Sequence, residues 1–105
     1  MDKLFHPEIK NVVLEQIFYA LSDSTRLMIF KRLYSSEKEE KCGCFEDLGK
    51  KNNLSHHFKV LRENGIIKVR IDGRNRYVSI RKDELNLKFP NLLDLIYDGC
   101  KKQIK

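Results

Sequence analysis

The fold of this chain is decided by residues 52–80, which read NNLSHHFKVLRENGIIKVRIDGRNRYVSI. In the first half of this stretch, Leu54, Phe58 and Leu61 recur at the spacing that places side chains on one face of a helix. The Asn64–Gly65 pair that follows favours a helix end, because both residue types tolerate a positive φ. The first half therefore predicts an amphipathic helix that ends near residue 65.

The second half of the stretch predicts a β-hairpin. Residues 66–71 (IIKVRI) are rich in β-branched side chains and partly alternate, and residues 76–80 (RYVSI) form a returning strand. The Asp-Gly-Arg-Asn run at 72–75 between them suits a hairpin turn. A helix followed directly by a hairpin indicates a winged helix-turn-helix fold, which is mainly α with a β-hairpin wing.

The outward face of the predicted helix is polar. Opposite the apolar stripe lie Asn52, His56, Lys59 and Glu63, with Ser55 on one flank. Asparagine, serine and histidine can exchange hydrogen bonds with base edges, and lysine can neutralise phosphates. Because an α-helix fits the major groove and a β-ribbon can lie along the adjacent backbone, this pattern favours double-stranded DNA as the partner.

The rest of the chain predicts shorter elements around this unit. The apolar spacing and the turn residues indicate where each begins and ends. The expected elements are a helix over 8–21, a helix over 24–34 capped by Ser22 or Asp23, one helical turn within 42–49, the helix capped by Asn52 or Asn53, a turn over 83–85, and a last helix over 90–103.

The positive charge is concentrated in one segment. The whole chain has a net charge of +6, but residues 50–82 hold ten basic and two acidic residues, a net charge of +8. The remaining eleven basic and thirteen acidic residues give −2. A basic region on a near-neutral scaffold is typical of a surface that binds a polyanion, and Arg70, Arg74 and Arg76 place part of it on the hairpin.

Length and composition narrow the class of protein. The 105 residues suit one winged-helix domain, 1–105, that both binds DNA and dimerises. No apolar run is long enough to cross a membrane, and the first residues lack the apolar core of a signal peptide, so we expect a cytoplasmic protein with three free thiols. No phosphate loop, nucleophile elbow or metalloprotease motif is present, so we expect neither an enzyme nor a cofactor.

Several runs of the sequence resemble the ArsR-type winged-helix repressors. These runs are ALSDSTRL at 20–27, LSHHFKVLRENGII at 54–67, and DGR at 72–74 followed by Tyr77. A later run, LKFPNLLD at 87–94, is similar to one sub-branch of the family. Apart from this later run, the resemblance covers about residues 13–80.

The resemblance implies a homodimer on a palindromic operator, with repression relieved by a signal. It also implies that the base-facing positions are Lys51, Asn52, Ser55 and His56. The family usually has Gln and Ser at the first two of these, so the operator sequence is expected to differ. The first helix of the helix-turn-helix is about one turn shorter here than in typical members. The residues expected to contact DNA are Lys50, Lys51, Asn52, Asn53, Ser55, His56, Lys59, Arg62, Arg70, Arg74 and Arg76.

The first and last helices carry more apolar residues than a small core can bury. An apolar face at a chain end needs a partner, which points to a dimer interface. The alternative is that both helices simply cover the core. The residues expected at the interface are Val13, Ile17, Leu93, Ile96 and Cys100.

The cysteines leave a sensing role open. Cys42 and Cys44 stand where many ArsR-type proteins begin a metal site, but Asp47 occupies the position of the third cysteine. Two thiolates do not complete a metal site, although Cys100 could add a third. We expect no metal site; a metal- or thiol-responsive repressor using these three cysteines, an unidentified small-molecule effector, and a winged helix that binds only protein are the alternatives.

Overall fold

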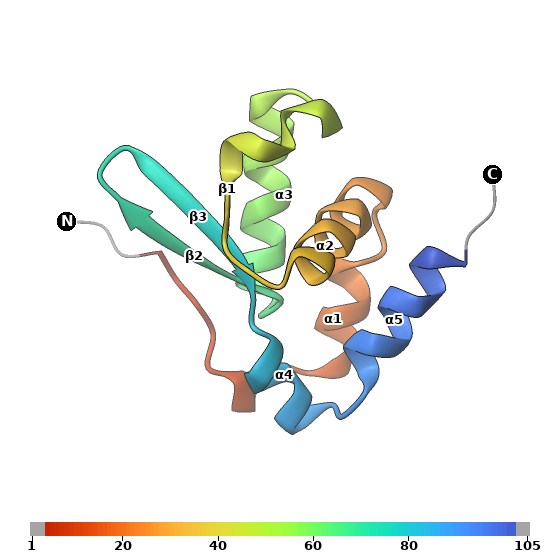
Figure 1. The fold of residues 1–105 in the computed structure, drawn as a ribbon. Helices are drawn as coiled ribbons and strands as arrows, with labels where there is room; N and C mark the ends of the chain where they lie inside the picture. Colours follow the sequence, from red (N-terminus) through yellow and green to blue (C-terminus); the bar gives the residue numbers. More distant parts are fainter. Residues whose placement is uncertain (1–3, 103–105) are drawn as a thin grey trace.

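The computed structural model describes residues 4–102 and shows short helices packed around a small antiparallel sheet (Figure 1). The strand order in the sheet is β1-β3-β2, so β3 is central and β2 is an edge strand. The elements are η1 (Ile9–Asn11), α1 (Leu14–Ala20), α2 (Ser24–Ser36), β1 (Glu40–Lys41), η2 (Cys42–Leu48), α3 (Lys51–Glu63), β2 (Ile67–Asp72), β3 (Asn75–Ile80), α4 (Lys82–Lys88) and α5 (Leu92–Lys101).

The helix expected over 8–21 is divided in two, which corrects the prediction. The 3-10 turn η1 ends at Asn11, and α1 begins at Leu14. Val12 and Val13 between them are extended. β-branched residues tolerate an extended backbone well, and here Val12 is fully buried. A Cβ at Gly65, which has φ +84°, would lie 2.6 Å from Cγ2 of Val12, so this contact needs glycine.

The capping expected at α2 is confirmed. The Asp23 carboxylate accepts hydrogen bonds from the backbone N–H groups of Thr25 at 2.9 Å and Arg26 at 3.1 Å. These bonds lower the pKa of Asp23, the Arg26 bond most strongly. The helix runs two residues further than expected and ends at Ser36.

The segment expected to hold one helical turn, 42–49, forms the seven-residue 3-10 helix η2, which supplies the first helix of the helix-turn-helix. The strand β1 just before it was not expected, because two residues are too few to show a pattern. β1 pairs with β3 through Glu40 with Val78 and Lys41 with Tyr77.

The helix and hairpin of residues 51–80 match the sequence prediction closely. Leu54, Phe58 and Leu61 are buried, α3 ends at Glu63, and β2 and β3 pair in register from Ile67–Ile80 to Asp72–Asn75. The expected cap is wrong, since Lys50 is the N-cap residue and makes no side-chain cap hydrogen bond.

The C-terminal part forms two helices rather than one turn and one helix. The expected turn over 83–85 lies within α4. The last helix begins at Leu92 rather than Pro90, after Asn91 with a φ of +68°. Its expected end at residue 103 lies outside the described residues. No helix in the described part of the chain is long and apolar enough to cross a membrane.

Candidate nucleic-acid interface

Helix α3 presents the polar face that the sequence predicts. Asn52, Ser55, His56 and Lys59 are all exposed, whereas the apolar stripe packs into the core. Glu63, expected on the same face, is exposed as well, so the polar face runs the length of α3. The exposed donors and acceptors can therefore reach a groove of DNA without any rearrangement of the helix.

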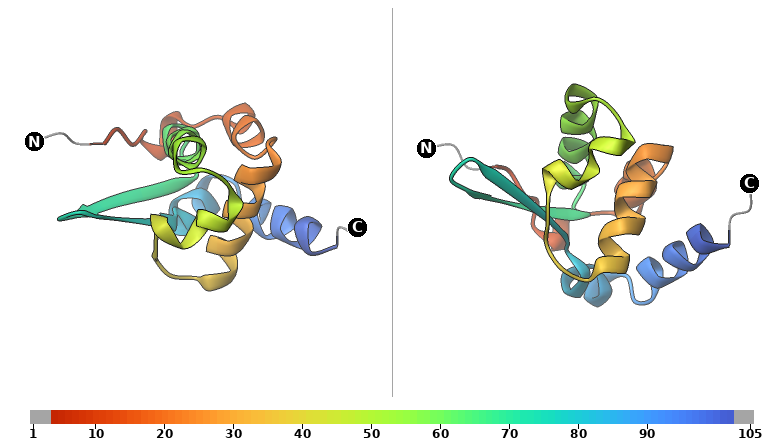
Figure 2. Two further views of the ribbon diagram at one scale, coloured as in Figure 1. Left: turned by 90° about the horizontal axis from the view of Figure 1, so that it is seen from above. Right: turned by 45° about the horizontal axis from the view of Figure 1, so that its top comes forward.

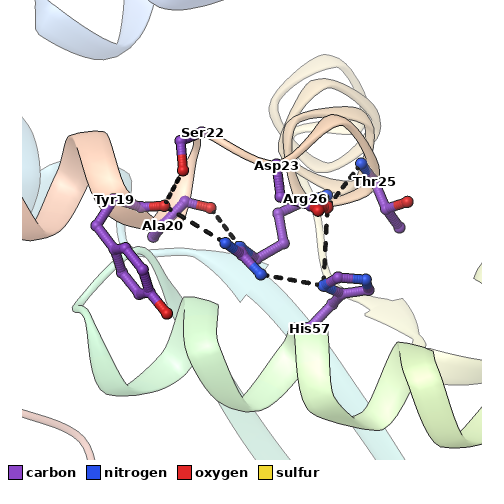
Figure 3. Close-up of polar contacts among 7 residues, drawn as sticks. All are labelled: Tyr19, Ala20, Ser22, Asp23, Thr25, Arg26 and His57. Atoms are coloured by element: carbon purple, nitrogen blue, oxygen red, sulfur yellow. Dashed lines mark hydrogen bonds and ion pairs between the residues drawn. The ribbon is translucent and has the colours of Figure 1, made fainter.

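A buried arginine fixes α3 against the turn between α1 and α2 (Figure 3). Arg26 is 7% exposed, and its Nε donates to the Ala20 carbonyl at 2.7 Å. Its Nη1 donates to Nδ1 of His57 on α3 at 3.2 Å, and that nitrogen lies 3.8 Å from the Asp23 carboxylate. The half-buried His57 thus ties α3 to the turn between α1 and α2.

The arginines of the wing differ in whether they already have an anionic partner within the chain. Arg74 and Arg76 are exposed at and beside its tip. Arg70 is also exposed, but its guanidinium donates to both oxygens of Glu39, with Nη2 at 2.9 Å from Oε1. It also lies 4.5 Å from the centre of the Tyr77 ring. Arg70 therefore already has an anionic partner, and Arg74 and Arg76 have none among the contacts of the described residues.

The polar face of α3 and the wing border one groove of about 660 Å³. Lys51, Ser55 and Lys59 line it from α3, and Arg74 and Arg76 line it from the wing. Lys41 and Asn75 also line the groove, and no sequence pattern beyond their charge or polarity indicates this position for either. The groove gathers positive charge from three separate segments on one side of the molecule.

One expected DNA-binding residue is misplaced. Arg62 is 8% exposed, and its Nη1 donates to the Phe5 carbonyl at 2.7 Å. The flank of α3 that carries Arg62 is covered by the N-terminal segment, which helical spacing alone cannot reveal. Arg62 is thus a structural residue, and the prediction that it contacts phosphate is wrong.

The N-terminus of α3 is basic and open. Lys50, Lys51, Asn52 and Asn53 are all exposed, and no acidic residue lies in the first turn. The first N–H groups of a helix and its dipole attract anions. An exposed, basic, uncapped helix start is suited to a phosphate group.

The cysteines do not converge on one point. Cys42 is half-buried, Cys44 is exposed and Cys100 is buried. Burial raises the pKa values of Cys42 and Cys100, which lowers their thiolate fraction. Asp47 is held by an ion pair with Arg32. Within the single chain described over 4–102, no group of three His, Cys, Asp or Glu side chains could hold a metal ion.

The expected dimer residues divide into two sets. Ile17 and Leu93 are 0% and 1% exposed and Cys100 is buried, so the core of the single chain already uses them and the prediction is wrong for these three. Val13 is exposed and Ile96 is half-buried. The apolar side chains that α1 and α5 do expose were missed, and they include Leu14, Phe18 and Leu95.

Comparison with known proteins places this arrangement in a family. Residues 21–70 match a helix-turn-helix domain family. YceK of Bacillus subtilis, an uncharacterized HTH-type transcriptional regulator, is 44% identical over 86 residues, which span 77% of this chain and 83% of the relative. An uncharacterized HTH-type transcriptional regulator of Methanocaldococcus jannaschii is 35% identical over 71 residues, or 67% of this chain and 80% of the relative.

Two solved structures share the fold. One, described as "Possible transcriptional regulator for arsenical resistance", superposes with a TM-score of 0.61 at 25% identity over 87% of this chain and 88% of the other. An ArsR family transcriptional regulator superposes with a TM-score of 0.62 at 20% identity over 95% of this chain and all of the other. With its helix-turn-helix, its wing and these relatives, the chain belongs to the HTH-type transcriptional regulators, and it shares its winged-helix fold with an ArsR family member.

Proposed function

We propose that this regulator binds a palindromic DNA operator as a homodimer and represses transcription there. The observation that carries the proposal is that the exposed face of α3 and the wing border the same basic groove. A duplex that lies across this surface meets hydrogen-bonding side chains from the helix and cations from the wing at once. A dimer bound over a promoter excludes other proteins from the same DNA, which gives repression.

The residues proposed to contact DNA fall into two sets, one suited to base edges and one suited to phosphates. Asn52, Ser55 and His56 are suited to base edges in the major groove, because their donors and acceptors are exposed on α3. The cations near them are suited to phosphates, which position the protein without specifying sequence. This second set consists of Lys41, Lys50, Lys51, Lys59, Arg74 and Arg76.

The dimer is supported by apolar surface at the opposite end of the molecule. Figure 2 shows α1 and α5 at the end away from the wing tip. Phe18 on α1 is 54% exposed and Leu95 on α5 is 71% exposed, with Leu14 also exposed. Helices that place large apolar side chains in water at a common end are suited to contact a second copy.

Selection of bound duplexes from a random DNA pool tests the proposal. We expect enrichment of an inverted repeat with half-sites about one helical turn apart. A dimer that neutralises about six phosphates should lose affinity with a log–log salt slope near −5. A pool without enrichment and an affinity insensitive to salt would instead support a winged helix that binds only protein.

Leu95→Glu tests the dimer. A charge in the interface should give a monomer by sedimentation and lower operator affinity by about 100-fold or more, because the two half-sites no longer act together. Leu87→Glu is the matched control, since Leu87 is an exposed leucine on α4 and should leave the mass unchanged. A Leu95→Glu protein that remains dimeric would contradict this interface.

In vitro transcription from a promoter containing the selected operator tests the direction of regulation. The protein should reduce the amount of transcript in proportion to operator occupancy. An increase in transcript at full occupancy would show an activator instead.

A further inference from the structure

The N-terminal segment is fastened to the DNA-binding unit by side chains from several elements. Besides the bond from Arg62 to Phe5, Arg81 donates from Nη1 to the Pro7 carbonyl at 2.8 Å, and Lys88 donates to the Lys10 carbonyl at 2.8 Å. Figures 1 and 2 show this segment on the side of the molecule that carries the wing. We refer to residues 4–7 as the N-terminal strap.

His6 connects the strap to the wing. Its Nε2 accepts a hydrogen bond from the backbone N–H of Val69 at 3.0 Å, and its Nδ1 lies 3.1 Å from the Leu4 carbonyl. Because Nε2 accepts, the neutral ring carries its proton on Nδ1 and donates it to Leu4. Val69 lies on the edge strand β2, so His6 pairs an N–H group that has no neighbouring strand.

The strap touches both parts of the proposed DNA interface. Arg62 holds it to α3 at Phe5, and one residue later His6 holds it to β2. Leu4 and Arg62 both line the groove between helix and wing. Two adjacent residues thus bridge the helix and the ribbon that must fit the same duplex.

We propose that the N-terminal strap fixes the position of the wing relative to α3, with His6 and Arg62 as positioning residues for DNA binding. The inference rests on the proposed function. A hairpin that projects from a small body can swing about its base, and each orientation that does not fit the duplex lowers the affinity. Because α3 is packed into the core through its apolar stripe, the strap restrains the wing relative to a fixed helix, so its contribution passes through the wing phosphate contacts.

The surroundings of His6 make this link sensitive to acid. Arg62 on α3, Lys68 on β2 and Arg81 after β3 face the ring, and Glu84 on α4 is paired with Arg81. Burial, followed by these three cations, lowers the pKa of His6 against the opposing effect of its bond to Leu4. The undocked strap therefore takes up a proton first, and docking weakens as the pH falls below about 6.5.

The test compares His6→Ala with His6→Gln, whose amide oxygen can still accept from Val69. At pH 7.5 His6→Ala should speed hydrogen exchange at the Val69 amide and lower operator affinity by about 2- to 10-fold, as expected for one lost hydrogen bond. His6→Gln should restore the slow exchange at the Val69 amide and the operator affinity. In this variant the protection of the Val69 amide should no longer weaken at acid pH. Equal exchange at Val69 in the wild type and His6→Ala would overturn the proposal.

A double-mutant cycle separates positioning from general stability. Combined with Arg74→Ala and Arg76→Ala on the wing, His6→Ala should add less than about a 2-fold loss of affinity, because the wing contacts it serves are already gone. Combined with Asn52→Ala on α3, His6→Ala should lower operator affinity by as much as it does alone. Full additivity with both partners would overturn the proposal.

Arg62→Gln gives a second readout. A positioning residue should lower affinity without changing the log–log salt slope, whereas loss of a phosphate contact reduces the slope. A reduced slope would return Arg62 to the phosphate contacts and overturn its assigned role. If the wild type bound no duplex, the proposed function would fail together with this inference, whereas normal binding by His6→Ala would refute the inference alone.

Discussion

Helices α2 and α3 are both 13 residues long, yet they begin in opposite ways. The Asp23 carboxylate caps α2 with two hydrogen bonds. The N-cap residue of α3, Lys50, makes no side-chain cap hydrogen bond, and Lys51, the first residue of the helix, adds a second positive charge. An anionic cap stabilises a helix start, whereas cations there oppose the helix dipole.

The difference shows which helix supports the fold and which is suited to contact a ligand. α2 is closed at its start and, with Arg26, holds the turn against α3. α3 leaves its first N–H groups and its lysines to solvent at the mouth of the groove, where a phosphate can take the place of the missing cap. The protein thus gives up some helix stability at the point where the proposed DNA contact begins.

Among substitutions at the two helix starts and the wing, Lys50→Asp should lower DNA affinity most, although it should raise the stability of the fold. The new cap should raise the free energy of unfolding by about 1 kcal/mol. The reversed charge should lower affinity for any duplex by about 10-fold or more, since a phosphate now meets a carboxylate. Urea unfolding and fluorescence anisotropy measure the two quantities.

Lys38→Asp makes the same charge change in an exposed loop and serves as the control. It should reduce affinity far less. Equal losses for both variants would mean that the α3 start responds only to net charge.

Arg74→Ala and Arg70→Ala should differ although both remove a wing arginine. Arg74 is free to meet a phosphate, so its loss should weaken all duplexes about equally and reduce the salt slope by about one for each protomer. Arg70 is already paired with Glu39, so its loss should change affinity less than about 2-fold. The affinities of both variants for one duplex, measured over a range of salt concentrations, test this difference. A larger loss of affinity for Arg70→Ala than for Arg74→Ala would refute it.

Asp23→Ala should give the smallest effect on DNA and a clear effect on stability. Loss of the cap should lower the free energy of unfolding by about 1 kcal/mol at neutral pH. Because the pKa of Asp23 is lowered in the folded state, its contribution is complete above its ordinary value of 3.8 and is lost as the pH falls through the folded pKa. Thermal unfolding curves of the two proteins should therefore converge towards pH 2.

The sequence predicts the helix–hairpin unit because its signals are local. The α3 stripe, the turn at 72–75 and the Asp23 cap each depend on residues a few positions apart. Arg62 could not be assigned correctly, because its partner is a backbone carbonyl 57 residues away. Ile17 and Leu93 were assigned to a dimer because periodicity identifies an apolar residue without showing whether its own chain or a partner covers it.

If α3 reads bases while the wing holds phosphates of the same duplex, substitutions in the two should have different effects. The measurement is the affinity of Asn52→Ala and Arg74→Ala for the selected operator and for a scrambled duplex, each over a range of salt concentrations. Asn52→Ala should reduce the preference for the operator by about 1–3 kcal/mol with an unchanged salt slope, and Arg74→Ala should reduce the slope with an unchanged preference. The reverse pattern would contradict the account.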